Sequence, residues 1–321
     1  MTRQTIEPAS TPRTGLARGG AWLDQQPYLL LSLTSLFWAI NIVLARYVAG
    51  HVPPLTLTCL RWFGTCALLL PFAWPHLKND WHKIARQWPL MLMLSATGFA
   101  LNNALSYWAL HYTQALNALL IQSSGPLFVA IWSLALFGAR LTRAQLIGIT
   151  ISLLGVLTIV LRGNVAALGE VELNRGDLMF AGALLAFGLY SALMPRRPQT
   201  HQLSFLTIGT GLGGVMLLPF AIWEITNGAV VHFDAVTLGT LIYVIVFASA
   251  LAYLFYNRGL ALIGPNRAAP FFHLVPVFGS AMAILFLGEQ MRLFHIVGYM
   301  MVLAGVIIAS RQQRPPARLD A

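Results

Sequence analysis

The chain contains an internal repeat within a hydrophobic pattern of membrane-spanning length. Residues 100–161 align with residues 250–311 at a constant shift of 150, without gaps. The identities include the residues with the most specific backbone roles, proline and glycine. Duplicated apolar halves of this kind are typical of secondary transporters. The main pairs are Pro126 with Pro276, Phe128 with Phe278, Gly138 with Gly288, Gly148 with Gly298, Gly155 with Gly305, and Val156 with Val306.

The composition indicates that lipid is the main solvent. Hydrophobic residues make up 57% of the chain and charged residues 9%, whereas a soluble domain has roughly 25% charged residues. The net charge of +10 is not interpreted as a nucleic-acid surface, because the basic residues lie mostly between apolar runs. The bilayer is therefore the expected partner, and nucleic acid is not.

The apolar runs predict an all-α integral membrane protein with ten transmembrane helices. Most runs approach the ~20 residues that a spanning helix needs, and they are continuous rather than alternating, which disfavours barrel strands. We predict a cytoplasmic tail over 1–26, a first repeat over 27–161, a linker over 162–176, a second repeat over 177–310 and a tail over 311–321. The expected spans are 27–48, 54–74, 88–110, 114–137, 143–161, 177–194, 203–223, 236–257, 265–287 and 293–310.

The basic residues predict the orientation of the chain. If the N-terminus is cytoplasmic, fifteen Arg and Lys residues lie inside and four lie outside, which is a strong positive-inside bias. Both termini are then cytoplasmic, and so is the segment from His76 to Trp88, which we expect to lie along the membrane surface. Because five helices per half is an odd number, the second half enters from the opposite side and the repeats are inverted.

Three segments of the sequence resemble a known family. They are LFWAINIVLARY (36–47), the run from YWALHYTQ to LLGVLTI (107–159), and the looser second copy from YNRGLALIGP to LAGVII (256–308). Together they resemble the EamA family of the drug/metabolite transporter superfamily. The resemblance implies a ten-helix body that moves small metabolites, often outward, across the inner membrane. The family pattern has a glutamate after the fourth helix of each half. In this sequence the second half has that glutamate, Glu289, whereas the first half has Ala139 at the equivalent position.

Arg61 is the most informative polar residue, because a charge within a span costs roughly 2.5–3.5 kcal/mol on insertion scales. It lies about seven residues into the second predicted span. One interpretation is a fixed cation that faces a cavity and binds a substrate carboxylate. The other is snorkelling to the outer interface, which a long side chain can reach from this depth.

Two predicted helices at matching positions carry matching polar faces. Asn103 and Tyr107 share a face of the third span, and Tyr253 and Asn257 have the same spacing in the eighth. We expect both faces to line one central cavity. The alternative is hydrogen bonding between helices, which is worth ~0.6 kcal/mol per pair on average. Further candidates for substrate binding are Asn41 and Tyr190.

The fourth and ninth spans each contain a proline that we expect to kink the helix, Pro126 and Pro276. Gln122 lies near the first proline and is a further cavity candidate. His273, three residues before the second, is the only imidazole deep in a predicted span. It either handles a proton or is a hydrogen-bonded structural residue.

The acidic residues and motifs limit the energy source. Each carboxylate lies at a helix end, in a loop or in a tail, which disfavours proton coupling through an intramembrane acid. The sequence has neither a phosphate-binding GK[ST] loop nor a metal-binding HExxH motif, so neither ATP nor a metal or other cofactor is expected.

The predicted function is secondary transport of small organic metabolites, with amino acids or related compounds as the favoured class. A membrane enzyme, a lipid-handling protein and a non-transporting sensor or scaffold are the alternatives. Monomer and homodimer both remain open.

Overall fold

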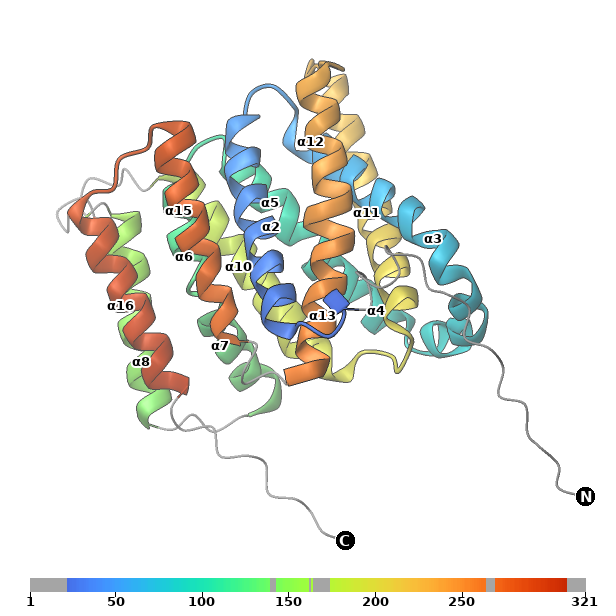
Figure 1. The fold of residues 1–321 in the computed structure, drawn as a ribbon, viewed down its shortest axis with the longest axis horizontal. Helices are drawn as coiled ribbons and strands as arrows, with labels where there is room; N and C mark the ends of the chain where they lie inside the picture. The colour runs from blue at the N-terminus through green and yellow to red at the C-terminus, as the bar shows by residue number, and fades with distance from the viewer. Residues whose placement is uncertain (1–21, 139–142, 162, 164–173, 264–268, 311–321) are drawn as a thin grey trace, which may run out of the picture.

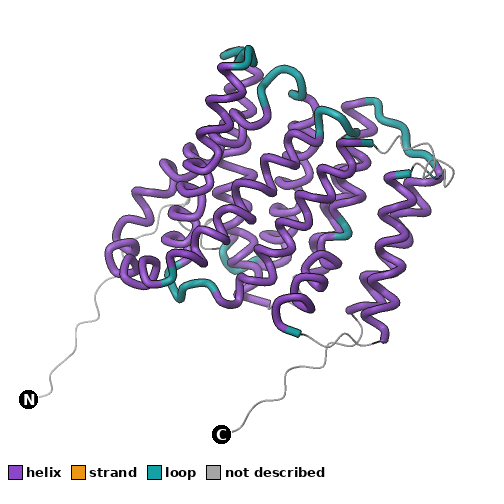
Figure 2. The backbone as a smooth tube through the Cα atoms, turned by 180° about the vertical axis from the view of Figure 1, so that it is seen from behind, coloured by secondary structure: helices purple, strands orange, loops and turns teal. Residues whose placement is uncertain are grey.

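The computed structural model describes residues 22–138, 143–161, 163, 174–263 and 269–310. These residues form a bundle of helices without strands (Figures 1 and 2). The helices of the first half are α2 (Pro27–Tyr47), α3 (Pro54–Arg86), α4 (Trp88–Ser95), α5 (Asn102–Ala109), α6 (Ala115–Gln122), α7 (Gly125–Phe137) and α8 (Arg143–Val160). Those of the second half are α10 (Arg175–Leu193), α11 (Gln202–Thr226), α12 (Ala235–Ile245), α13 (Ala252–Ile263), α15 (Leu274–Leu287) and α16 (Leu293–Ser310).

The shift of 150 found in the sequence recurs in the backbone. A π-helical segment, η1 (Ala96–Leu101), joins α4 to α5, and a second one, η3 (Val246–Leu251), joins α12 to α13 at the shifted position. Gly138 and Gly288 end α7 and α15 in the left-handed conformation, at φ 59° and 65°, which a residue with a side chain rarely adopts. The two halves therefore share irregular features as well as helices.

The helices of the two halves interleave. At one end of the bundle α8 packs along α16, and at the other end α3 packs along α11 (Figure 1). Between them α2 packs against α13 and α15, while α10 packs against α5 and α7. When the first half is exchanged for the second, the α8–α16 and α3–α11 pairs map onto themselves, and the contacts of α2 with α13 and α15 map onto those of α10 with α5 and α7. The bundle is thus built from reciprocal contacts between halves.

Glycine permits the close approach of α8 to α16. A Cβ atom at Gly305 would lie 2.4 Å from the carbonyl oxygen of Gly148, and one at Gly155 would lie 2.6 Å from that of Gly298. Small residues at such contacts let helix backbones pack closely where the hydrophobic effect between helices is weak.

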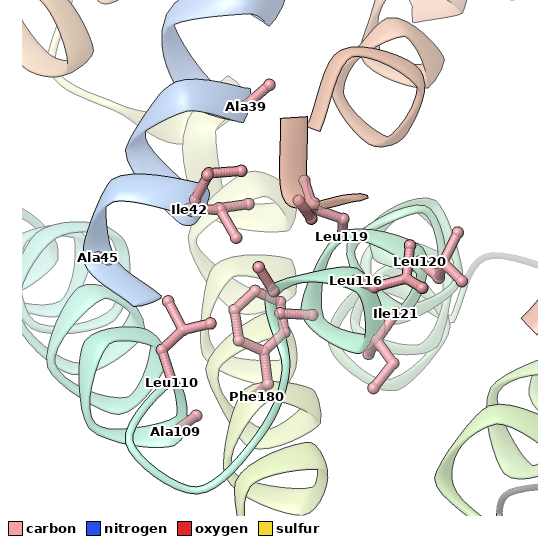
Figure 3. Packing of buried hydrophobic residues seen from close by; sticks show 14 of the residues in the cluster. Ala39, Ile42, Ala45, Ala109, Leu110, Leu116, Leu119, Leu120, Ile121 and Phe180 are labelled. Atoms are coloured by element: carbon pink, nitrogen blue, oxygen red, sulfur yellow. The ribbon is translucent and has the colours of Figure 1, made fainter. Parts of the chain in front are cut away.

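An apolar core fills the space between α2, α5, α6, α10 and α15. Figure 3 shows the ring of Phe180, from α10, between Leu110 at the end of α5 and Leu116 in α6. Large apolar side chains also cover the outside of the bundle, for example Leu285 and Phe286, which are 76% and 74% exposed. An apolar core with an apolar exterior fits a protein surrounded by lipid.

Five described helical segments are long and apolar enough to cross a membrane, and α6 with α7 form a sixth if that bent pair is counted as one span. This confirms the prediction of an all-helical, multi-pass membrane protein. The five are Pro27–Tyr47, Pro54–Arg86, Arg175–Arg196, Gln202–Thr226 and Ala235–Gly259.

The segment from His76 to Trp88, predicted to lie along the membrane surface, belongs largely to helix α3. Helix α3 continues without a break from Pro54 to Arg86, although it contains Pro71 and Pro75. Ile84 is 1% exposed whereas Trp81 is 56% exposed, so one side of this segment packs inside the bundle and another side does not. The C-terminal part of α3 packs against α11 because its apolar side chains are buried in that contact. Residues 1–21 of the predicted N-terminal tail, the whole predicted C-terminal tail and most of the predicted linker lie outside the described residues.

Candidate functional site

Arg61 lies in the interior of the bundle, on α3, and is 2% exposed. Its Nε donates to Ser249 Oγ at 2.7 Å, and its Nη1 donates to Asn103 Oδ1 at 3.0 Å and to Tyr107 Oη at 3.1 Å. Its Nη2 donates to the Ala248 carbonyl at 3.4 Å, the longest of the four bonds. The side chain is directed between the helices and does not extend to an outer interface.

All of these acceptors are neutral. Among the residues that the structure describes, no carboxylate forms an ion pair with Arg61. The guanidinium carbon lies 4.5 Å from the centre of the Trp62 ring, an arrangement that provides some electrostatic stabilisation for a cation. Arginine keeps its charge in proteins, so the centre of the bundle contains a positive charge that hydrogen bonds stabilise without neutralising.

The network extends to α2 and to the first π segment. Tyr107 donates its hydroxyl hydrogen to Asn41 Oδ1 at 2.5 Å. Asn103 donates from Nδ2 to the carbonyls of Gly98 and Phe99, at 3.3 and 3.2 Å. The structure therefore brings together Asn41, Arg61, Asn103 and Tyr107, and it joins them to η3 of the other half.

The two π segments depend on side chains of α3 for part of their hydrogen bonding. A π-helical turn disrupts the regular i→i−4 ladder, so buried carbonyls there need other donors. Trp62 Nε1 donates to the Phe99 carbonyl at 2.7 Å, and Arg61 donates to the Ala248 carbonyl. Ser249 Oγ donates to the Val244 carbonyl at 2.7 Å. Adjacent residues of α3 thus hold both segments.

Tyr190 and Tyr253 lie beside the network as part of an aromatic cluster. Phe99 lies between them, with ring-centre distances of 5.8 Å to Tyr190 and 6.1 Å to Tyr253. Trp38 lies 6.0 Å from the Tyr253 ring. The Tyr190 ring also contacts the backbone at Gly98, where an added Cβ would come within 2.3 Å of the ring. None of the four hydrogen bonds of Arg61 described above involves either tyrosine.

The remaining predicted site residues lie apart from the network. Gln122 ends α6, and Asn257 is half-buried on α13 without a hydrogen bond to the cluster. His273 ends the 3₁₀ segment η4 (Ala269–His273). Its Nδ1 is buried and has no partner among the described residues.

The two prolines lie at helix starts. Pro126 is in the first turn of α7, which makes an angle of 48° with α6, and Ser124 Oγ donates to the Ile121 carbonyl at this break. Pro276 is in the first turn of α15, directly after η4. Within α15 it does not interrupt a continuous helix, because the first turn has no intrahelical use for its missing N–H.

The sequence did not indicate a second polar cluster, which joins α6, α10 and α16. Asp177 is completely buried in the first turn of α10, where Thr113 and Asn117 donate to its carboxylate. Asn117 Oδ1 lies 2.8 Å from Nε2 of His295. The position of Asp177 at a helix start was visible in the sequence, but its burial follows from packing against another element and was not.

The described residues contain no group of three or more His, Cys, Asp or Glu side chains placed to hold a metal ion. The Arg61 site can offer a ligand hydrogen-bond donors and a positive charge.

Comparison with known proteins identifies the family. The EamA-like transporter model matches residues 25–161 and again residues 174–311. The chain belongs to the EamA-like transporter family. The resemblance found in the sequence is thereby confirmed, and membrane transport is the activity for which the relatives of this EamA protein are named.

Three curated relatives illustrate this. An uncharacterized transporter, YyaM, of Bacillus subtilis is 28% identical over 90% of this chain and 95% of its own. A probable amino-acid metabolite efflux pump of Salmonella typhimurium is 26% identical over 89% and 95%. A probable terminal-alkyne amino-acid exporter of Streptantibioticus cattleyicolor is 24% identical over 71% and 75%.

One solved crystal structure has the same fold. It aligns with a TM-score of 0.61 at 18% identity, over 89% of this chain and 98% of the other. At that identity the likeness concerns the fold alone.

The Arg61 network predicts an unequal effect of two buried serines. Ser249 accepts from Arg61 and donates to Val244, so Ser249→Ala leaves the Nε donor of a buried charge unpaired, at a cost of about 1–3 kcal/mol. Ser95 bonds only to Met91 of its own helix, so Ser95→Ala is the matched control. Thermal unfolding of the purified protein should show a lower midpoint for Ser249→Ala than for Ser95→Ala. Equal midpoints would show that Ser249 does not support the arginine.

Proposed function

We propose that this EamA protein is a secondary transporter of small organic metabolites in the inner membrane, and that it binds its substrate through a carboxylate at Arg61. The observation that supports the proposal is the buried guanidinium with only neutral partners among the described residues. A substrate carboxylate supplies the missing negative charge and forms bidentate hydrogen bonds with a guanidinium.

The site is placed where the two halves meet. Asn41, Arg61 and Asn103 belong to the first half, whereas Ala248 and Ser249 belong to the second. A substrate bound here interacts with both halves at once, as transport by movement of one half against the other requires.

We further propose an order in which bonds are exchanged. The Nη2 bond to the Ala248 carbonyl is the longest of the four, so a carboxylate displaces this acceptor first. Ala248 lies in η3, and its release frees the π segment to change its hydrogen-bond pattern. The π segments are then the points at which the long helices bend between an outward and an inward form.

The favoured substrates are amino acids and related compounds, moved outward or to equilibrium. Two relatives that are named for amino-acid export support this class. The carboxylate binds Arg61, while the aromatic rings of Trp38, Phe99 and Tyr253 provide a surface for an apolar side chain. Asn103 and Tyr107 orient the guanidinium.

The arrangement that accompanies this function has ten spans, two inverted five-helix repeats and cytoplasmic termini. The reciprocal contacts between halves support it, as does the positive-inside bias of the sequence.

Labelling of single cysteines in intact cells with an impermeant maleimide tests the topology. We expect labelling of cysteines introduced at Tyr112 and Asn227, which are then outside, and protection of cysteines at Lys83 and Arg196, which are then inside. The background is a variant in which Cys59 and Cys66 are replaced. Labelling at both Lys83 and Asn227, or at neither, would contradict inverted repeats, whereas labelling at Lys83 with protection at Asn227 would reverse the predicted orientation.

Counterflow of radiolabelled amino acids in proteoliposomes tests the function. Wild-type protein should exchange at least one amino acid against an internal pool. Arg61→Gln should raise the half-saturating concentration for that amino acid by roughly 10–100-fold, which corresponds to about 1.5–3 kcal/mol for a lost charged hydrogen bond. For the amide derivative of the same amino acid, Arg61→Gln should reduce transport less than it does for the acid.

Arg258→Gln is the matched control, because Arg258 pairs with Asp24 away from the network. Wild-type protein without counterflow for any amino acid would contradict the proposed substrate class. Equal losses for acid and amide, together with a low yield of Arg61→Gln protein, would indicate a purely structural arginine. A sensor or scaffold would show no exchange at all.

A further inference from the structure

A polar cavity lies apart from the Arg61 network, where α2 ends, α6 begins and α15 connects to α16. Its volume is about 590 Å³, within the range of small-molecule pockets, roughly 300–1,000 Å³. Polar side chains make up most of its wall. The lining includes Arg46, Gln114, Asn117, Glu289, Arg292 and His295.

The cavity has a positive character. Glu289 is the one carboxylate in its lining, and both of its oxygens accept backbone hydrogen bonds, from Ala115 at 2.9 Å and Leu116 at 2.7 Å. The Glu289 carboxylate is therefore directed at the backbone N–H groups at the start of α6 and forms no ion pair with a described arginine. Two guanidinium groups remain, from Arg46 and Arg292.

Both arginines keep donors for a ligand. Arg46 uses Nη1 for the carbonyl of Leu110, at 2.7 Å, and more weakly for that of His111. Its Nε and Nη2 have no acceptor within the described part of the chain. The Arg292 guanidinium likewise has no hydrogen bond or ion pair to any described residue, since only its backbone N–H is engaged there.

The wall beside Arg292 is rigid. His295 Nδ1 accepts from the Arg292 backbone N–H at 3.0 Å, and its Nε2 donates to Asn117 Oδ1 at 2.8 Å. Asn117 donates in turn to the buried Asp177. His295 and Asn117 are 2% and 3% exposed. This chain of hydrogen bonds fixes the backbone of the turn that carries Arg292 before any ligand arrives.

We infer that this cavity binds a small soluble organic anion, with a carboxylate held by Arg46 and Arg292. A planar guanidinium group can bind a carboxylate through two parallel hydrogen bonds, and the cavity has two such groups. The polar wall favours a hydrophilic solute over a lipid acyl chain, because Gln114, Asn117 and Gln290 offer hydrogen bonds rather than an apolar groove. Binding at this site is distinct from transport through Arg61 and does not require it.

Calorimetric titration of the protein in phosphatidylcholine nanodiscs tests the inference. Succinate is the probe, and its uncharged diamide, succinamide, is the neutral analogue. We expect saturable succinate binding, no measurable binding of succinamide, and at least tenfold weaker succinate binding by Arg292→Gln and by Arg46→Gln. Arg292→Gln is the cleaner variant, since the Arg292 side chain supports no described backbone group, whereas Arg46 does.

Arg175→Gln is the matched control, an exposed arginine at the start of α10 that does not line the cavity. It should bind succinate like wild type, and Arg61→Gln should as well. A melting curve of each variant confirms that it is folded. Failure of Arg61→Gln in counterflow with intact succinate binding would separate the two sites.

Four results would overturn the inference. The first is the absence of saturable succinate binding to wild type. The second is an equal loss in Arg175→Gln and Arg292→Gln, which would indicate diffuse charge. The third is binding that Arg61→Gln abolishes and Arg292→Gln preserves, which would place the anion at the central network. Nanodiscs that contain phosphatidylglycerol distinguish the source of the anion: if that lipid displaces succinate only when Arg292 is present, the occupant is a lipid phosphate and the soluble ligand is wrong.

Discussion

A guanidinium group without a charged partner among the described residues organises the centre of this protein. Burying a charge in an apolar interior is costly unless hydrogen bonds and dipoles replace the lost water. Arg61 has a set of neutral acceptors from two elements, α5 and η3, and the face of Trp62. These contacts stabilise the cation but leave its charge unneutralised. A carboxylate that enters the site adds the Coulombic attraction that the neutral acceptors cannot.

The π segments follow from the same constraint. In lipid, or in a dry interior, each freed carbonyl must find a donor within the protein. Trp62 supplies one to η1, and Arg61 supplies one to η3. Because the two donors are neighbours on α3, a change in the bonding of Arg61 alters the support of one π segment and leaves the other held. Each half thus contains a π segment, but different side chains of α3 donate to the two segments.

Much of this could be predicted from the sequence. The apolar runs and the repeat predict a helical membrane protein of duplicated design, and the insertion cost of a charge singles out Arg61. The spacing of Asn103 and Tyr107 predicts that they share a helical face, and both contact Arg61. For these residues local periodicity and tertiary structure agree.

The prediction was less complete for the second half. Tyr253 and Asn257 have the spacing of Asn103 and Tyr107, yet they do not join the network. At the shift of 150, the position that corresponds to Arg61 is Gly211, so the second half has no cation at the equivalent place to gather polar side chains. Ser249 corresponds to Phe99, and its role depends on the π turn, which side-chain spacing does not reveal. The burial of Asp177 depends on contacts between distant segments in the same way.

Hydrogen–deuterium exchange over residues 246–251 tests the central claim most directly, namely that Arg61 holds η3 until a carboxylate takes its place. The measurement compares nanodisc-embedded wild type and Arg61→Gln, each with and without an amino acid that wild type exchanges in counterflow. We predict that the amino acid makes exchange in wild type faster. In Arg61→Gln we predict fast exchange both with and without the amino acid. Slow exchange in this segment in all four samples would contradict it.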